Sequence, residues 1–303
     1  MASEPLRFYH RYRRAIETEA IYGEAWLRWA YETPTGRFAT WLVARRPLFS
    51  RYFGWRMSWR ASGRHVFPFI VDYNLDADEF AKSAFEYRTF NEFFTRALKP
   101  TARPIAEPEN ARLAVFPADG RHLGFANVDD APGFYVKGAK FTLTELLGDA
   151  SLGASFAGGA MIISRLCPVD YHRFHFPVRG LPDDGHIVGK WLYSVSPIAL
   201  RRNVRRLVEN KRRITQIDSQ EFGRVAMIEV GATNVGSIVE TYVPGRVATK
   251  GEEKGMFKFG GSCVITVFQR NRITLDADLL AQSLAGLELY AKMGDHMGLA
   301  RSS

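Results

Sequence analysis

The greater part of the chain, from Leu113 onward, consists of short apolar runs separated by glycine, proline and aspartate. Runs such as 160–164, 225–230 and 235–243 are rich in β-branched residues and are short for buried helices. Short strands with frequent turn residues are typical of antiparallel sheets. The pattern predicts an α+β protein with a mostly antiparallel β core, in which residues 142–147 form one short helix.

Residues 1–100 have a different pattern. Apolar residues follow helical spacing over 8–60, with breaks at Pro34 and Pro47. The acidic stretch 76–79 and the capping-box spacing of 89–92 indicate two further helix starts. We therefore expect a helical N-terminal segment over 1–100 and a β-rich core over 101–303.

Charge and tryptophan are concentrated in the first quarter of the chain. Residues 1–75 hold twelve Arg, no Lys and six Asp or Glu, and they hold five of the six Trp. Arginine and tryptophan suit an anionic lipid surface, where guanidinium groups meet phosphates and indoles sit at headgroup level. They also suit single-stranded nucleic acid, or a helical scaffold with a solvated basic face. We expect the membrane surface and no nucleic acid.

Several classes of protein are not expected from this sequence. It has no apolar run of 18 residues, so no transmembrane helix is predicted, and its N-terminus lacks the apolar region of a secretory signal. Cys167 and Cys263 are too few for a disulfide framework and lack metal-site spacing. Both are predicted to be buried thiols in a reducing cytoplasm.

The stretch 250–268 is a charged, glycine-rich segment that leads into an apolar run. Gly260 and Gly261 precede Ser262, and residues 263–268 read as a buried strand. A glycine pair lets the backbone adopt conformations that other residues avoid. The segment is either a tight turn into a strand or a reactive serine beside an open peptide carbonyl.

Three other side chains offer acid–base chemistry. His172 and His175 lie three residues apart, and Asp119 lies in a Pro/Gly turn. A metal site is not expected, because no third ligand accompanies the histidines. Each residue alone suits a structural role, but Asp119, His175 and Ser262 together supply an orienting group, a base and a nucleophile.

A series of motifs then follows in one order along the chain. They are Phe90-Asn-Glu-Phe-Phe-Thr-Arg96, Pro117-Ala-Asp-Gly120, Val136-Lys-Gly138, Asp170-Tyr-His-Arg-Phe-His175, Leu192-Tyr-Ser-Val195, Val235-Gly-Ser-Ile238, Lys250-Gly-Glu-Glu253 and Phe257-Lys-Phe-Gly-Gly-Ser262. Each motif alone is weak. Together and in this order they resemble the phosphatidylserine decarboxylase family over roughly 88–268.

The resemblance implies a pyruvoyl enzyme made from an inactive proenzyme. Ser262 would attack the carbonyl of Gly261, with His175 as base and Asp119 orienting it, and the ester would break by β-elimination. The chain would divide into 1–261 and 262–303, the β-rich part being the catalytic core. Residue 262 would become an N-terminal pyruvoyl group, the cofactor that forms a Schiff base with phosphatidylserine. His172 would act in decarboxylation or protonate the carbanion, and phosphatidylethanolamine would be the product.

The resemblance also implies partners and a location. The expected partners are the phospholipid substrate, an anionic membrane surface and the chain's own cleaved subunit, and a homodimer is left open. We expect a peripheral protein on the cytoplasmic side of the cell membrane.

Alternatives remain open at this level. The chain could decarboxylate a soluble aromatic amino acid, or it could be an uncleaved membrane-binding protein or a serine hydrolase. The hydrolase is disfavoured because Ser262 is not in a Gly-x-Ser-x-Gly elbow. One departure from the family concerns Cys263, where Thr or Ser is common. A thiol is a weaker hydrogen-bonding group than a hydroxyl, so slower maturation is an open expectation.

Overall fold

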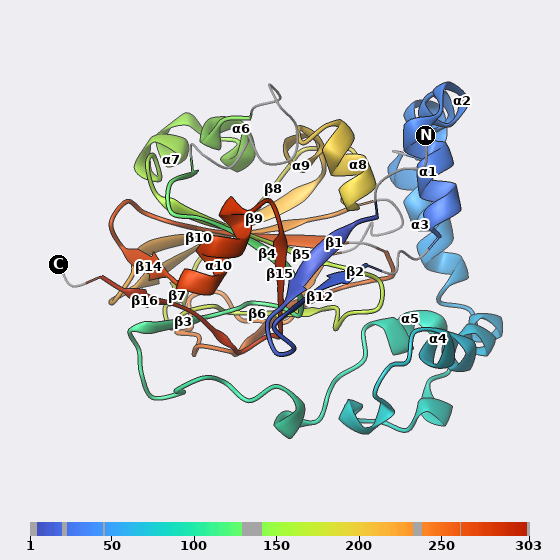
Figure 1. Ribbon diagram of the computed structural model, residues 1–303, viewed down its shortest axis with the longest axis horizontal. Helices are drawn as coiled ribbons and strands as arrows, with labels where there is room; N and C mark the ends of the chain where they lie inside the picture. The colour runs from blue at the N-terminus through green and yellow to red at the C-terminus, as the bar shows by residue number, and fades with distance from the viewer. Residues whose placement is uncertain are drawn as a thin grey trace.

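The structure is a computed structural model that describes residues 5–19, 23–44, 46–128, 141–232, 238–260 and 262–301. Figure 1 shows a sheet-rich body with a column of helices along one side. Within the described residues the main sheet has the strand order β2-β1-β15-β4-β5-β13-β10-β9-β7, with β8 also paired to β9. Two smaller sheets have the orders β11-β12-β6 and β14-β16-β3.

The strands are named in chain order. Their bounds are β1 Arg7–His10, β2 Ala15–Thr18, β3 Leu113–Val115, β4 Gly120–Phe125, β5 Ala160–Leu166, β6 Arg173–His175, β7 Leu181–Pro182, β8 His186–Val188, β9 Arg212–Ser219, β10 Gly223–Val230, β11 Ile238–Glu240, β12 Glu253–Phe257, β13 Ser262–Phe268, β14 Ile273–Leu275, β15 Glu288–Ala291 and β16 His296–Ala300. Apart from the parallel pair β1–β15, the pairings of the described strands are antiparallel, which confirms the predicted core.

The helices are short. The α-helices are α1 Glu24–Glu32, α2 Pro34–Ala39, α3 Pro47–Arg56, α4 Val66–Asp72, α5 Phe90–Phe94, α6 Leu143–Leu147, α7 Ala150–Ser155, α8 Pro197–Arg202, α9 Arg206–Glu209 and α10 Ala277–Leu284. The tighter or wider turns are η1 Thr40–Ala44, η2 Arg60–His65, η3 Ala77–Glu79, η4 Ala84–Glu86 and η5 Pro100–Ala102. Within the described ranges, no helix has the length and apolar character needed to cross a bilayer.

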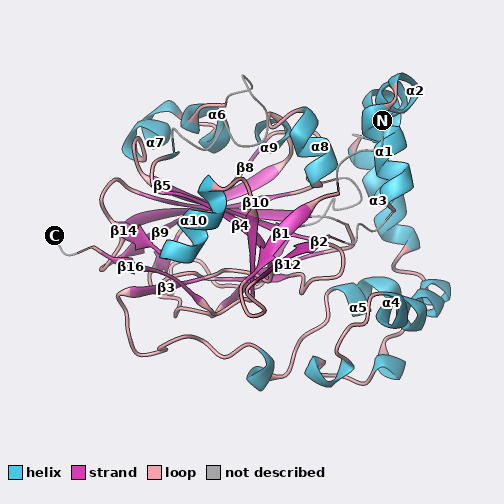
Figure 2. Ribbon diagram, in the orientation of Figure 1, coloured by secondary structure: helices cyan, strands magenta, loops and turns pink. Residues whose placement is uncertain are grey.

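The two faces of the main sheet are covered differently. Figure 2 shows helices α6 to α9 over one face, and the smaller sheets lie against the other. Side chains alternate along a strand, so β13 contributes side chains to the hydrophobic cores on both faces of the main sheet. Val264 and Phe268 join the core facing the small sheets, whereas Cys263, Ile265 and Val267 join the core under the helices.

Three local predictions are confirmed or refined. The helix expected over 142–147 is α6, where Thr142 and Glu145 form a capping box. Thr89 caps α5 by accepting a hydrogen bond from the Glu92 amide. The stretch 76–79 forms a single 3-10 turn, capped by Asp76, rather than a longer helix.

One prediction in the N-terminal segment is wrong. The helical pattern expected from residue 8 begins only at Glu24, because residues 7–18 form the β1–β2 hairpin. Strand β1 pairs in parallel with β15, and Phe8 is buried beneath the guanidinium of Arg121. The ladder and this contact come from distant parts of the chain, so tertiary pairing overrides the local pattern.

Candidate active site

Ser262 is the first residue of β13, in the middle of the main sheet. It pairs with Leu166 of β5 and has no exposed surface. Gly260, two residues earlier, has a φ of 137°, a backbone conformation that favours glycine. The second glycine of the predicted cleavage site, Gly261, lies outside the described residues. A buried hydroxyl thus stands two residues after a glycine-dependent bend.

His172 is the nearest base to Ser262 in this geometry. Its Nδ1 lies 3.3 Å from Ser262 Oγ, and its Nε2 lies 2.9 Å from the carbonyl oxygen of Cys167. A carbonyl only accepts hydrogen bonds, so Nε2 carries the ring proton and Nδ1 has a free lone pair. The Ser262 hydroxyl therefore donates to Nδ1.

The surroundings keep His172 neutral. Its ring stacks on Phe94, with centroids 3.9 Å apart, and has no exposed surface. Burial lowers the pKa of His172 to about 3, and the positive charge of Arg96 acts in the same direction. At neutral pH the ring is a hydrogen-bond acceptor toward Ser262.

His175 ends strand β6, three residues beyond His172. Its Nδ1 lies 3.0 Å from the carbonyl oxygen of Gly251, so by the same reasoning Nδ1 carries the proton. Its Nε2 is buried and has no hydrogen-bond partner among the residues that the structure describes. Burial lowers the pKa of His175, while the Gly251 carbonyl, Glu253 and Asp119 oppose that shift.

Asp119 is held by a bidentate arginine. Arg103 Nε lies 2.8 and 2.9 Å from its two carboxylate oxygens, and the backbone amide of Met293 donates to Oδ1 at 2.9 Å. Arg103 also pairs with Glu79. The carboxylate is therefore buried, paired with a guanidinium and held in one position.

The structure brings some of the predicted residues into contact and not others. Ser262 contacts His172, whereas among the described residues no hydrogen bond joins His175 to Ser262 or to Asp119. Asp119 acts on His175 through its charge. No group of three metal-ligating side chains occurs in the part of the chain that the structure describes. The motif residues 136–138 and 235–237 lie outside that part.

Sequence reasoning missed the groups that hold these side chains. The Cys167 carbonyl, Arg103 and the Phe94 ring each fix one of them. Phe94 lies in the motif 90–96, and Cys167 lies shortly before the motif 170–175. Their positions in or near these motifs are the sequence signal that could have indicated them. A backbone carbonyl carries no sequence signature, so the contact with Cys167 required the structure.

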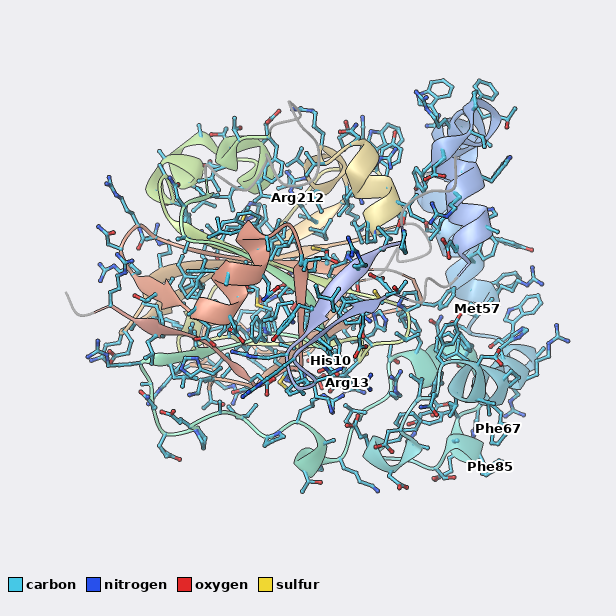
Figure 3. All side chains as sticks on the ribbon, in the orientation of Figure 1. His10, Arg13, Met57, Phe67, Phe85 and Arg212 are labelled. Atoms are coloured by element: carbon cyan, nitrogen blue, oxygen red, sulfur yellow. The ribbon has the colours of Figure 1, made fainter. Side chains whose placement is uncertain are left out.

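An exposed aromatic and basic surface lies on the N-terminal helices. Its five tryptophans are 42–56% exposed: Trp26, Trp29, Trp41, Trp55 and Trp59. Exposed arginines lie on the same segments: Arg37, Arg46, Arg56, Arg60 and Arg64. Phe67 and Phe85 stack on each other with centroids 5.6 Å apart, and Figure 3 places them at the outer edge of the same helical region. We call these residues the aromatic–basic surface.

Comparison with known proteins places this geometry in context. The family model described as phosphatidylserine decarboxylase matches residues 90–298. The phosphatidylserine decarboxylase proenzyme of Chlamydia trachomatis serovar D is 42% identical over 303 residues, which is 100% of both chains. The proenzymes of Clostridium kluyveri and Clostridium beijerinckii are 38% and 39% identical, covering 97% of this chain and 99% and 98% of their own lengths.

Proposed function

This chain belongs to the phosphatidylserine decarboxylase family, and from that premise we propose how its own residues carry out the reaction. The enzyme converts phosphatidylserine to phosphatidylethanolamine and is made as a proenzyme that cleaves itself. The alternatives, a soluble amino acid decarboxylase or an uncleaved membrane protein, are not favoured by relatives that match along the whole chain.

One observation supports the proposed cleavage site above all. The hydroxyl of Ser262 is fully buried, follows the bend at Gly260 and hydrogen-bonds an unprotonated imidazole nitrogen. A serine hydroxyl has one hydrogen bond to donate. Ser262 donates it to an imidazole base rather than to a backbone carbonyl. These residues fit a pyruvoyl group derived from Ser262, since the group would stand in a dry site beside His172.

We propose that cleavage proceeds through the hydroxyl of Ser262. Its oxygen attacks the carbonyl carbon of Gly261, the peptide C–N bond breaks, and an ester forms while the nitrogen of residue 262 becomes a free amine. A base removes the α-proton of residue 262, and the Gly261 carboxylate leaves by β-elimination. Water then hydrolyses the resulting enamine, through its imine tautomer, to a ketone and ammonia, which balances the reaction.

The base for this reaction has two candidates. His175, assigned by the resemblance, has a buried Nε2 with no partner in the described part of the chain, and a catalytic role would explain such a group. Asp119 stabilises a positive charge on that ring. His172 is the second candidate, because its Nδ1 already accepts a hydrogen bond from the Ser262 hydroxyl. We propose His175 as the base and reserve His172 for proton transfer during decarboxylation.

The pyruvoyl group, when formed, supplies a ketone that condenses with the substrate amine and withdraws electrons as carbon dioxide leaves. The chain's own residues exclude water and place the proton. Phe94 covers His172, and Phe259 packs edge-on against Phe94 with ring centroids 5.1 Å apart. His172 Nδ1 points at residue 262, so it holds or delivers a proton at that position.

We further propose that the aromatic–basic surface docks the enzyme on the cytoplasmic face of an anionic membrane. Its half-exposed indoles match the headgroup region, and its arginines match lipid phosphates. A homodimer remains a proposal that only a solution measurement of mass addresses.

Intact-mass spectrometry of wild type and three variants tests the cleavage proposal. Wild type should give two chains parted between residues 261 and 262, with a borohydride-reducible carbonyl on the shorter one. Ser262→Ala and His175→Ala should stay whole, and His172→Ala should divide but lose decarboxylation. A whole His172→Ala with a divided His175→Ala would move the base role to His172.

The chain offers a matched control for this experiment. Ser164 and His122 form a second buried serine–histidine pair in the same sheet, 2.9 Å apart, with no glycine pair beside it. Ser164→Ala should divide like wild type. A whole Ser164→Ala protein would show that loss of any buried serine blocks maturation, which would overturn the assignment to Ser262.

A further inference from the structure

The turn that precedes His172 is closed by two hydrogen bonds between Asp170 and Cys167. Asp170 Oδ2 accepts a hydrogen bond from the Cys167 amide at 2.6 Å, and the Asp170 amide donates to the Cys167 carbonyl at 2.9 Å. The same carbonyl accepts from His172 Nε2 at 2.9 Å. Cys167 is thus the point where the turn and the imidazole meet.

Two buried arginines hold this turn, one at the Asp170 side chain and one at its backbone carbonyl. Arg121 Nη1 lies 2.7 and 2.6 Å from the two carboxylate oxygens of Asp170. Its guanidinium stacks near the rings of Phe8 and Tyr290, at 5.0 and 5.1 Å from their centroids. On the other side, Arg96 Nη2 lies 3.3 Å from the Asp170 carbonyl oxygen. The turn therefore has little freedom to reorient.

The orientation of the Cys167 carbonyl decides which nitrogen of His172 carries the proton. With the carbonyl 2.9 Å from Nε2, the tautomer protonated at Nδ1 would place two lone pairs against each other. That tautomer would also deprive Ser262 of its acceptor. A turn of another shape would leave the two tautomers closer in energy.

We propose that Asp170, paired with Arg121, is a positioning residue that fixes the tautomer and direction of His172 through the Cys167 carbonyl. This role rests on the proposed part that His172 plays beside residue 262. A plain structural role is the competing explanation, because a buried ion pair also anchors β4 to the turn. The two explanations differ in what happens to the His172 proton.

Nitrogen-15 NMR of histidine-labelled Ser262→Ala protein gives a direct readout. This variant lacks the serine contact, so the turn alone sets the tautomer. We expect His172 in the form protonated at Nε2. A spectrum with His172 protonated at Nδ1 in this parent overturns the proposal whatever the further variants do.

Paired substitutions then separate positioning from stability. Asp170→Ala with Arg121→Met removes both charges, so no unpaired buried cation remains, and it should give mixed His172 tautomers. Asp170→Asn with Arg121→Met restores an acceptor for the Cys167 amide and should restore the single tautomer. An unchanged spectrum in the first pair would overturn the proposal.

Glu288→Gln is the matched control. Glu288 is a buried carboxylate of the neighbouring network, bonded to Arg165 at 2.5 Å, and Arg165 in turn contacts the Cys167 thiol rather than the carbonyl that faces His172. It should lower stability without changing the His172 spectrum. A tautomer change in this control as large as that in the alanine pair would favour the structural explanation.

Kinetic measurements on the mature forms of the paired variants, with Ser262 intact, test whether the His172 tautomer affects catalysis. The Ala/Met pair should lose kcat on the order of 10- to 100-fold, as outer-shell partners typically do, with a smaller change in KM. The Asn/Met pair should recover most of that loss. A mixed tautomer with unchanged kcat would leave the positioning role standing and instead contradict the part proposed for His172 in decarboxylation.

Discussion

Two buried serine–histidine pairs, each with its serine on a strand of the main sheet, differ in what stands beside them. Ser262 Oγ and His172 Nδ1 are 3.3 Å apart, and Ser164 Oγ and His122 Nδ1 are 2.9 Å apart. Only the first serine follows a glycine pair. We therefore expect the proposed cleavage to depend on the glycine pair in front of Ser262 as much as on the base.

Both histidines should make the folded protein sensitive to acid. Burial lowers the pKa of His122 and of His172 to about 3, whereas an unfolded histidine titrates near 6.5. Between these values the unfolded chain binds protons that the folded chain does not. The free energy of unfolding should thus fall with decreasing pH, by about 1.4 kcal/mol per pH unit for each buried histidine.

Urea unfolding of Ser262→Ala protein between about pH 6.5 and pH 5 measures this slope. His122→Gln should reduce the slope by the contribution of one bound proton. His186→Gln, at an exposed histidine, should leave the slope unchanged. Equal slopes for the parent and for His122→Gln would contradict the expectation.

Cys263, the departure from the family pattern, lies on the opposite face of β13 from Ser262. Its thiol belongs to the core under the helices, while Ser262 before it faces the other side of β13. Burial raises the pKa of the Cys263 thiol well above its usual value. A side chain on the opposite face gives no support to slower maturation through a weaker hydrogen bond at the cleavage site.

At the scale of elements, the β-rich core was predictable and the β1–β2 hairpin was not. The local sequence predicts strands β5, β10 and β13, because each is a run rich in β-branched residues next to turn residues. Strand β1 has four residues and pairs with β15, some 280 positions away in the register Phe8–Glu288. The sequence around β1 does not include β15, so local patterns do not predict this strand.

The N-terminal helices carry the prediction about membranes. Trp55 and Trp59 lie with ring centroids 4.3 Å apart and are both about half exposed. Replacing both with Ala should weaken binding to anionic vesicles by roughly tenfold, since interfacial indoles supply much of the apolar contact. Vesicle sedimentation at low and high salt measures this change.

Point substitutions are preferable here to removal of the whole segment. Glu19 on the same segment pairs with the buried Arg165, so truncation would also disturb the sheet. Leu284→Ala, at an 89% exposed leucine on α10, is the apolar control and should bind like wild type. Equal binding by the tryptophan variant and this control would show that the aromatic–basic surface does not dock the enzyme.

At the scale of the whole molecule, the division between residues 1–100 and 101–303 remains a prediction. The helical segment contacts the core through two apolar clusters, one around Phe94 and Phe259 and one around Tyr31 and Ala199. The residues of the candidate site were all recognisable from the ordered motifs. Their pairing was not, because the contact between Ser262 and His172 joins segments 90 positions apart.

The central place of β13 has a consequence for how the mature enzyme comes apart. The strand has seven register pairs with β5 and six with β10, and the segment after Ser262 also supplies β14, α10, β15 and β16. Once the chain is divided, folding changes from a unimolecular to a bimolecular reaction, so unfolded halves must find each other at a rate set by their concentration. Uncleaved Ser262→Ala protein should therefore refold from urea at any dilution. The mature enzyme should fail to recover when diluted, and equal recovery of both would contradict this difference in molecularity.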